Sequence, residues 1–325
     1  MKIIFLGSGG SVPTKDRGLP AVLVEYLNEL FLFDCGEGTL RQIMICSSKR
    51  NKRNEKSKEN RGKNDKINFM NINKILITHF HADHIAGLIG IINTMNFLDR
   101  RSNLEIYGGA GIRSIIKNLP VPKDAMRFVK IYEISEGQVV EGRRYKIIPF
   151  KTQHTAESLG FVFEEKEKRK FLKEKAVALG IPEGKLYSGL QRGESINFNG
   201  RTINPDDVLS EPIKGRKIVY TGDTTPCENT VKFAERCDIL IHDSTYSNID
   251  IDKISDHGHS TALQAAETAK KANAKSLFLI HISQRYADSK ILEDEAGKVF
   301  GNSYVVRDFT NVQISAPPEK KILIV

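Results

Sequence analysis

The chain has 325 residues, of which 40% are hydrophobic and 27% are charged, and its formal net charge is +9. The length allows one large domain or two ordinary ones, and the composition excludes a wholly disordered chain. No apolar run approaches the roughly 18 residues that a membrane-spanning helix needs, so we expect no membrane partner.

In chain order, runs rich in β-branched residues predict strands, and helical patterns lie between them. The predicted strands cover residues 3–7, 21–26, 30–34, 74–79, 129–134, 145–151, 159–164, 217–222, 238–242 and 276–281. The predicted helices cover residues 83–98, 228–236, 260–272 and 288–300. Many strands with helices between them favour a layered α/β architecture.

Residues 47–66 contain no hydrophobic side chain, and they hold nine Lys or Arg against three Asp or Glu, which is +6 of the net charge. Such a segment cannot bury enough surface to offset its ordering entropy. We predict a basic disordered insertion on the surface, with a basic loop that contacts RNA as the alternative. Because only +3 remains elsewhere, bulk charge is weak support for a polyanionic partner.

Residues 164–212 also depart from the strand and helix pattern. Residues 164–175 are dense in charge and favour a helix, and residues 180–195 are heavily punctuated by Gly and Pro. The segment lies between two predicted strands and has a weak core signature. We therefore expect it to be an arm that projects from the domain.

The four cysteines, Cys35, Cys46, Cys227 and Cys237, form no CxxC pair. The N-terminal apolar stretch is too short for a signal peptide. Reduced thiols and a cytoplasmic location are the interpretation that fits both observations.

The strongest chemical signal is Thr78-His79-Phe80-His81-Ala82-Asp83-His84, which follows an apolar predicted strand. Three imidazoles and one carboxylate within six residues are too polar for a core. At the end of a strand they can turn toward one point, and both kinds of group bind zinc. A histidine-rich surface loop is the alternative.

Three more candidate ligands, His154, Asp223 and His281, each follow or end a predicted strand. A lone histidine at a strand end is more commonly structural, but an incomplete donor set elsewhere in the chain reverses that preference. Together the five histidines and two aspartates can hold two metal ions that share one carboxylate.

These residues resemble the HxHxDH signature of the metallo-β-lactamase superfamily, and further stretches resemble its ribonuclease Z family of tRNA 3′ endonucleases. Residues 5–9 and 33–39 are similar to the family's N-terminal strands, and residues 13–18 to its PxKxRN loop, with Gly18 where Asn is usual. Residues 242–245 stand in the place of its HEAT motif, with the middle two residues changed. His259-Ser260-Thr261 matches its HST loop. Residues 180–195 are similar to its arm, but residues 183–185 lack the usual Gly-Pro core.

The resemblance implies one domain over residues 1–325, a four-layer αβ/βα sandwich with the metal ions at one edge of the sheets. It implies two zinc ions per subunit, although Mn²⁺ or another divalent ion also suits such ligands. One zinc would be held by His79, His81 and His154, the other by Asp83, His84 and His281, with Asp223 bridging. Asp34 is a candidate to orient one of these imidazoles, with a plain turn role as the alternative.

The same resemblance implies cleavage of precursor tRNA at its 3′ end, with a 3′-hydroxyl left on the tRNA and a 5′-phosphate on the trailer. Asp83 would accept the proton of the nucleophile, and His259 would protonate the leaving oxygen. The alternative is that His259 only neighbours a helix N-cap, because Ser260 or Thr261 suits that position. The arm would bind the RNA, and the family is typically a homodimer. The candidate RNA contacts are Lys15, Arg17, Lys185, Arg192 and Arg285.

Two alternatives remain at this stage. A small-molecule phosphodiesterase or another hydrolase of the same superfamily would need neither the arm nor the HST loop. A non-catalytic RNA-binding protein with structural metal would need a closed coordination sphere.

Overall fold

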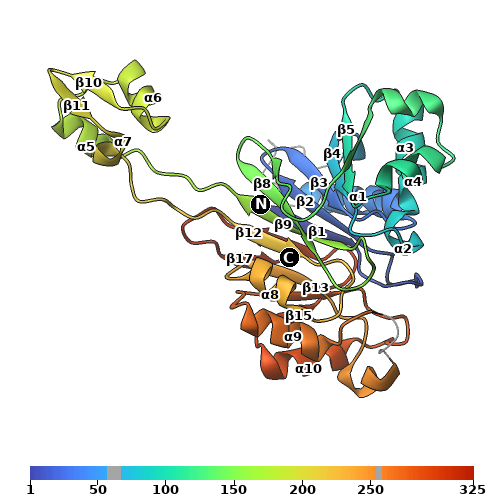
Figure 1. Cartoon of the computed structure of the whole chain (residues 1–325). Coiled ribbons are helices and arrows are strands. Elements are labelled where there is room, and N and C mark those ends of the chain that lie inside the picture. Colours follow the sequence, from blue (N-terminus) through green and yellow to red (C-terminus); the bar gives the residue numbers. More distant parts are fainter. Residues whose placement is uncertain (57–66, 254–257) are drawn as a thin grey trace.

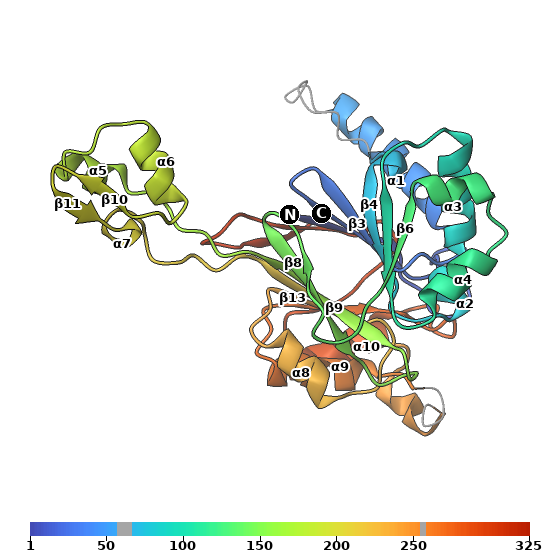
Figure 2. The same cartoon turned by 45° about the horizontal axis from the view of Figure 1, so that its top comes forward.

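The computed structural model describes residues 1–56, 67–253 and 258–325 of the chain. Within these residues, two large sheets pack face to face and helices cover both outer faces (Figure 1). Figure 2 shows α1, α3 and α4 outside one sheet and α8, α9 and α10 outside the other. This is the αβ/βα sandwich expected from the sequence.

The first sheet has the strand order β17-β16-β1-β2-β3-β4-β5-β6. The strands from β3 to β6 are parallel, and those from β17 to β3 are antiparallel. Their bounds are β1 (Lys2–Gly7), β2 (Ala21–Tyr26), β3 (Glu29–Phe33), β4 (Ile72–Leu76), β5 (Leu104–Gly108), β6 (Val129–Glu133), β16 (Asn311–Ile314) and β17 (Ile322–Ile324).

The second sheet has the strand order β15-β14-β13-β12-β9-β8-β7. The strands from β12 to β15 are parallel to one another. The other pairs are antiparallel: β7 with β8, β8 with β9, and β9 with β12. Their bounds are β7 (Val140–Glu141), β8 (Tyr145–Lys151), β9 (Leu159–Glu165), β12 (Lys217–Tyr220), β13 (Ile239–Asp243), β14 (Leu277–Ile280) and β15 (Ser303–Val305).

The helices of the first half of the chain lie outside the first sheet, and α8, α9 and α10 of the second half lie outside the second sheet. Those of the first half are α1 (Thr39–Lys56), α2 (Ala82–Ile85), α3 (Gly87–Phe97) and α4 (Ile112–Asn118), with 3₁₀ turns η1 (Phe69–Asn71) and η2 (Lys123–Arg127). Those of the second half are α8 (Glu228–Ala234), α9 (Ala262–Lys271) and α10 (Lys290–Val299), with η3 (Asn248–Lys253).

The core between the two sheets is rich in aromatic rings. The Phe31 ring lies edge-on to Tyr145, with centroids 4.9 Å apart, and to Phe163, at 5.1 Å. Phe5 stacks on Phe278 across the same layer at 5.8 Å. Such pairs contribute roughly 0.5–1.5 kcal/mol each beyond the area they bury. The rigid double sheet is what holds the strand ends in a fixed arrangement.

Several strand ends converge at one edge of the molecule. The parallel strands β4, β12, β13 and β14 all point their carboxyl ends there, and the β8–β9 connection turns at the same edge, because the backbone NH of Leu159 donates to the carbonyl of Thr78 (2.9 Å). Crevices outside the carboxyl ends of parallel strands are the usual ligand sites of α/β proteins.

The arm leaves the opposite end of the second sheet. It begins after Glu165, the last residue of β9, and returns to β12 at Lys217. Two extended segments form a stalk, joined by the Lys168–Ile213 and Phe171–Leu209 bridges. A head at its tip has its own small core, which includes Tyr187, and projects away from the body (Figure 1). It contains α5 (Lys173–Ala178), α6 (Lys185–Gln191), β10 (Ile196–Phe198), β11 (Arg201–Ile203) and α7 (Pro205–Val208).

The structure differs from the sequence-based expectations in several elements. The helix predicted over 83–98 is divided into α2 and α3 at Ala86, where the backbone NH of Gly87 donates to the carbonyl of Cys35 (2.9 Å) and not to a carbonyl of the helix. Residues 166–171 are extended stalk, where we expected a helix. The sequence patterns do not predict seven of the described strands, namely β5, β7, β10, β11, β15, β16 and β17.

The predicted insertion at 47–66 is described only in part. Helix α1 continues to Lys56, so the backbone of residues 47–56 is helical, in contrast to the expected disorder. Lys, Arg and Glu have high helix propensity, so a helix can continue without an apolar face. Residues 57–66 lie outside the described residues. Among the described helices, none is long and apolar enough to cross a membrane.

Candidate metal centre

The histidine-rich loop follows β4 and enters α2 at the edge where the strand ends converge. His79 and His84 are buried, whereas His81, the N-cap residue of α2, is exposed. His81 has extended backbone and α2 begins at the next residue, so Asp83 and His84 lie on the first turn of a helix.

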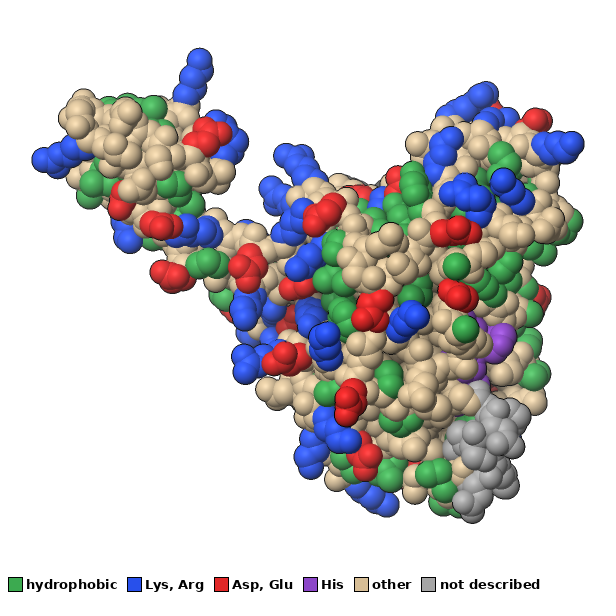
Figure 3. Space-filling model, in the orientation of Figure 1, with side chains coloured by type: hydrophobic (Ala, Val, Ile, Leu, Met, Phe, Trp, Pro, Cys, Tyr) green, Lys and Arg blue, Asp and Glu red, His purple; other side chains and the backbone are tan. Residues whose placement is uncertain are grey.

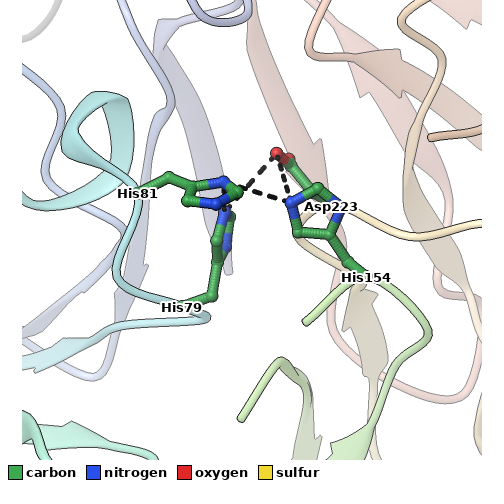
Figure 4. Close-up of side chains that lie close together, drawn as sticks. All are labelled: His79, His81, His154 and Asp223. Carbon is green, nitrogen blue, oxygen red and sulfur yellow. Dashed lines mark hydrogen bonds and ion pairs between the residues drawn. The ribbon is translucent and has the colours of Figure 1, made fainter. Parts of the chain in front are cut away.

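One donor set consists of His79, His81, His154 and Asp223 (Figure 4). Nδ1 of His81 lies 3.0 Å from Nε2 of His79 and 3.1 Å from Nε2 of His154. Oδ2 of Asp223 lies 3.6 Å from Nε2 of His79 and 3.9 Å from Nε2 of His154. Three ring nitrogens and a carboxylate oxygen therefore face a common point.

A second donor set consists of Asp83, His84, His281 and again Asp223. Nε2 of His84 and Nε2 of His281 each lie 3.3 Å from Oδ2 of Asp223. Oδ2 of Asp83 lies 3.3 Å from Nε2 of His281 and 3.6 Å from Nε2 of His84. Because Asp223 belongs to both sets, the arrangement matches the shared-carboxylate pair predicted from the sequence.

Hydrogen bonds on the outer side fix the orientation of the rings. Nδ1 of His84 donates to Oδ2 of Asp34 (2.8 Å), and Nδ1 of His154 donates to the carbonyl of Gly258 (2.8 Å). Each bond leaves Nε2 as the free acceptor directed into the site, as a metal-binding imidazole requires. Asp34 thus has the orienting role that was one of its two sequence-based interpretations.

His281 is oriented by a chain of two hydrogen bonds. Its Nδ1 lies 2.7 Å from Oγ1 of Thr245, which donates to Oδ1 of Asp243 (2.7 Å). Its backbone has a φ of 64°, and a side chain on Gly10 would come within 2.3 Å of its Nδ1. His281 therefore fits only because Gly10 carries no Cβ.

Two buried atoms of the centre have no hydrogen-bond partner among the described residues, namely Nε2 of His84 and Oδ1 of Asp223. Buried polar atoms are normally satisfied, and an unsatisfied one needs an explanation. Nitrogen and carboxylate oxygen are good ligands for zinc and similar divalent ions. The residues present therefore fit metal ions.

Most charges of the centre also suit cation binding. The exception is His84, because burial lowers its pKa but Asp223 and Asp34 raise it well above its usual value, so metal binding must displace a proton from its ring. Burial lowers the pKa of His79 to about 2, helped by the neighbouring His84, so its ring is neutral as a ligand must be. Although burial raises the pKa of Asp223, the surrounding His281 and His84 hold it well below its usual range. In the same way, burial raises the pKa of Asp83, but the His281 hydrogen bond and His84 keep it below its usual range.

His259 lies beside the two donor sets, on the loop that precedes α9. Its Nδ1 donates to Oδ2 of Asp243 (2.8 Å), and its ring stacks on His281 with centroids 4.9 Å apart. Burial lowers the pKa of His259, but Asp243 and Asp223 outweigh burial and raise it to about 9. The helix cap belongs to Thr261, whose side chain accepts from Gln264, so His259 itself has no capping role.

The candidate RNA contacts are not brought together in one place. Lys15 and Arg17 line a cavity of about 850 Å³ beside the start of α1. Lys15 is exposed, but the guanidinium of Arg17 donates to Oγ of Ser8 (2.7 Å) and to the carbonyl of Val306 (2.7 Å). Arg17 therefore orders its own loop.

The other three candidates occupy two different sites. Lys185 and Arg192 lie on the head of the arm, on and directly after α6. Arg285 lies near the metal centre, with its guanidinium 4.8 Å from the centre of the Tyr246 ring, which is 6.2 Å from the His259 ring.

Sequence reasoning missed several residues that position the site. Tyr220 donates from its hydroxyl to Oδ2 of Asp34 (2.8 Å), and the backbone NH of Ser11 donates to Oδ2 of Asp83 (2.9 Å). Thr245 could have been identified from the sequence, because it lies in the segment that resembles the HEAT motif. For Tyr220 and Ser11 no local sequence signal exists, since their partners lie 186 and 72 residues away.

Comparison with known proteins defines the family. Residues 1–173 match the model described as anti-Pycsar protein Apyc1, and residues 191–282 match that of the beta-lactamase superfamily domain. Ribonuclease Z of Archaeoglobus fulgidus is 41% identical over 320 residues, covering 97% of this chain and 98% of that protein. Ribonuclease Z of Methanothermobacter thermautotrophicus is 37% identical over 318 residues, covering 97% of each. The solved human tRNase Z, short form, has a TM-score of 0.63 and 26% identity, covering 98% of this chain and 100% of that chain.

The two-sheet fold and the paired donor sets define a metal-dependent hydrolase of the metallo-β-lactamase fold. With full-length relatives at 37–41% identity, the chain belongs to the ribonuclease Z family and is a metal-dependent endoribonuclease.

Proposed function

We propose that the chain cleaves precursor tRNA at its 3′ end and leaves a 3′-hydroxyl on the tRNA and a 5′-phosphate on the trailer. The observation that carries the proposal is the pair of donor sets that share Asp223. The near full-length similarity to ribonuclease Z, and to the human protein whose name specifies tRNA, supports the substrate. The projecting arm also supports a large substrate, because a small phosphodiester needs no such extension.

We propose two zinc ions per subunit, with Mn²⁺ or another divalent ion as a substitute. His79, His81 and His154 would hold one ion, Asp83, His84 and His281 the other, and Asp223 would bridge them. Bound in this way, the ions supply Lewis-acid activation of water and neutralise the charge of the phosphate in the transition state.

The chain's own side chains would move the two protons of the reaction. Asp83 is ionised and held by the backbone NH of Ser11, so it can accept the proton of the attacking water. The water oxygen becomes part of the 5′-phosphate of the trailer. His259, with Nδ1 held by Asp243, would give a proton from Nε2 to the departing ribose 3′-oxygen, which becomes the 3′-hydroxyl of the tRNA.

The position of each candidate RNA contact suggests which part of the substrate it would bind. Arg285 is held over Tyr246 close to His259, so it is suited to a phosphate next to the scissile bond. Lys15 is exposed on the loop ordered by Arg17. Lys185 and Arg192 on the arm are suited to the body of the tRNA.

The direction of the arm supports a homodimer. The arm begins at the end of β9 opposite to the metal centre, and a seven-residue strand spans roughly 20 Å. It also projects away from its own body (Figure 2). An arm placed in this way would hold a substrate whose scissile bond lies in a second subunit. A cytoplasmic location is supported by free thiols at all four cysteines.

The test is to map the ends of the products from a precursor tRNA incubated with protein that has been stripped of metal and reloaded with zinc. We expect one cut at the 3′ end, with the stated termini, that disappears on chelation and returns with two equivalents of zinc. Hydrolysis of bis(p-nitrophenyl) phosphate without any cleavage of the precursor would instead identify a small-molecule phosphodiesterase. Metal-dependent folding without either activity would identify a structural metal site.

A further inference from the structure

A groove lies at the base of the arm, on the opposite end of the second sheet from the metal centre. It encloses about 890 Å³ between the β7–β8 turn at residues 143–144, the stalk of the arm, and the near side of the head at residues 191–193 and 204–206. Figure 3 shows Lys and Arg side chains along the stalk and the adjoining edge of the body, interspersed with acidic ones. None of the metal-binding residues lines this groove.

Most of the acidic side chains in the groove are already neutralised. Glu165 forms a buried ion pair with Arg216, whose Nε lies 2.8 Å from its Oε2. Asp206 is paired with Arg169. Glu167 is the other acidic residue of the lining, and it is exposed.

The cationic side chains are not balanced to the same extent. Lys166 is paired with Glu141, and Arg192 with Glu194. Three further cations of the lining are exposed and have no acidic partner within the described part of the chain, namely Arg143, Arg144 and Lys168. The groove therefore presents a surplus of positive charge.

The turn that carries the two arginines is held rigidly. The carbonyl of Arg144 accepts from the backbone NH of Lys166 (2.9 Å) and from the hydroxyl of Tyr26 (3.3 Å). The backbone NH of Gly142 donates to the carbonyl of Tyr145 (2.9 Å), a core residue of the sandwich. Because the backbone of the turn is already fixed, only the two side chains must be ordered on binding, and their guanidinium groups suit bidentate contacts to phosphate.

We propose that this groove binds the phosphodiester backbone of RNA through Arg143, Arg144 and Lys168. It is a contact separate from the metal centre and continuous with the side of the head that carries Arg192 and Asp206, and the assignment of the RNA as the precursor tRNA rests on the proposed function. An open groove that follows the stalk suits an extended polyanion better than a single small anion. The contact would hold the substrate in register between the arm and the body.

The test is the double variant Arg143→Gln/Arg144→Gln, compared with Lys270→Gln/Lys271→Gln, which removes the same charge from the exposed end of α9. Binding and cleavage of precursor tRNA are measured between 50 and 200 mM salt. Because each phosphate contact contributes about one unit to the slope of log Kd against log salt, the arginine variant should lose about two units. Its KM should rise at least several-fold while kcat is retained, and Arg143→Lys/Arg144→Lys should recover most of the slope.

A slope and a KM equal to those of the lysine control would overturn the groove assignment. So would a fall in kcat and in melting temperature without a change of slope, because that result identifies a structural role for the turn. The groove assignment and the proposed function can be contradicted independently. Absence of precursor cleavage by the unmodified protein contradicts the proposed function. The salt dependence of RNA binding still reports on the groove in that case.

Discussion

At the scale of single residues, the metal centre depends as much on the groups behind the ligands as on the ligands. His84 is oriented by Asp34, and His281 by Thr245. Small changes behind a ligand typically lower metal affinity by roughly 10–100-fold, because the ring no longer points its free nitrogen at the metal.

The first residue-scale prediction concerns Gly10. In Gly10→Ala the new methyl would lie 2.3 Å from Nδ1 of His281, so the ring must move and break its bond to Thr245. We expect zinc affinity to fall roughly 10–100-fold, measured by competition with a chromogenic chelator. The matched control is Gly90→Ala on α3, where no atom lies within 4 Å of the new methyl. Equal affinities in the two variants would contradict the packing argument.

The second concerns His259. If it protonates the leaving oxygen, His259→Ala should keep its zinc content and lose about 10²–10⁴-fold in the rate of precursor cleavage. The loss should be much smaller with bis(p-nitrophenyl) phosphate, because p-nitrophenolate leaves without a proton. Both rates are to be compared at equal zinc occupancy. An equal loss on both substrates would exclude leaving-group protonation and leave His259 a positioning role.

At the scale of elements, the arm is a separate small unit on a stalk. Its head packs around its own core residues, such as Ile181 and Leu190, and not against the sandwich. The stalk is closed at its base by the buried Glu165–Arg216 pair, which also ties to the carbonyl of Ile314 (3.0 Å). The direction of the arm is therefore set by the sandwich, whereas its internal fold is not.

This arrangement allows a clean deletion. Lys168 and Ile213 are antiparallel partners, so an Asn-Gly turn in place of residues 169–212 can join them as a tight hairpin. We expect the shortened protein to retain two zinc ions and its activity on bis(p-nitrophenyl) phosphate. Its KM for precursor tRNA should rise steeply. Loss of both activities together would show instead that the arm supports the fold of the body.

At the scale of the whole molecule, the arm and the metal centre lie at opposite ends of the same strands. Leu159, the first residue of β9, donates to Thr78 at the metal edge, and the arm begins after Glu165, the last residue of the same strand. A substrate held by the arm is thus directed away from the centre of its own subunit, which motivates a test for function between subunits.

Mixing two variants that are each expected to cleave precursor tRNA poorly or not at all provides that test. One lacks the arm but keeps the metal centre, and the other is Asp223→Ala, which loses the shared ligand but keeps the arm. If the protein forms the proposed homodimer, subunit exchange makes half of the dimers mixed, each with one complete combination, so we expect precursor cleavage to return to roughly a quarter of the unmodified rate. Separate incubation of the two variants is the control. No recovery, with subunit exchange verified by mass, would mean that each arm serves its own centre.

The sequence by itself was enough to predict the fold class and the seven candidate metal ligands that the structure brings together. His79, His81, Asp83 and His84 lie within six residues at the end of a strand, so their chemistry is visible locally. His154, Asp223 and His281 each follow a strand whose apolar pattern is clear. Hydrophobic periodicity and motif spacing are local properties of the sequence, so they can be recognised without knowing any distant contact.

The tertiary structure decided what depends on distant partners. It gave Asp34 its orienting role through contacts to Thr78, His84 and Tyr220, and it turned Arg17 inward onto Val306. It also directed the arm away from the metal centre, since that direction follows from the antiparallel pairing of β9 with β12 and not from any residue in the arm. Such contacts join segments up to 289 residues apart, and no local pattern encodes which of them will meet.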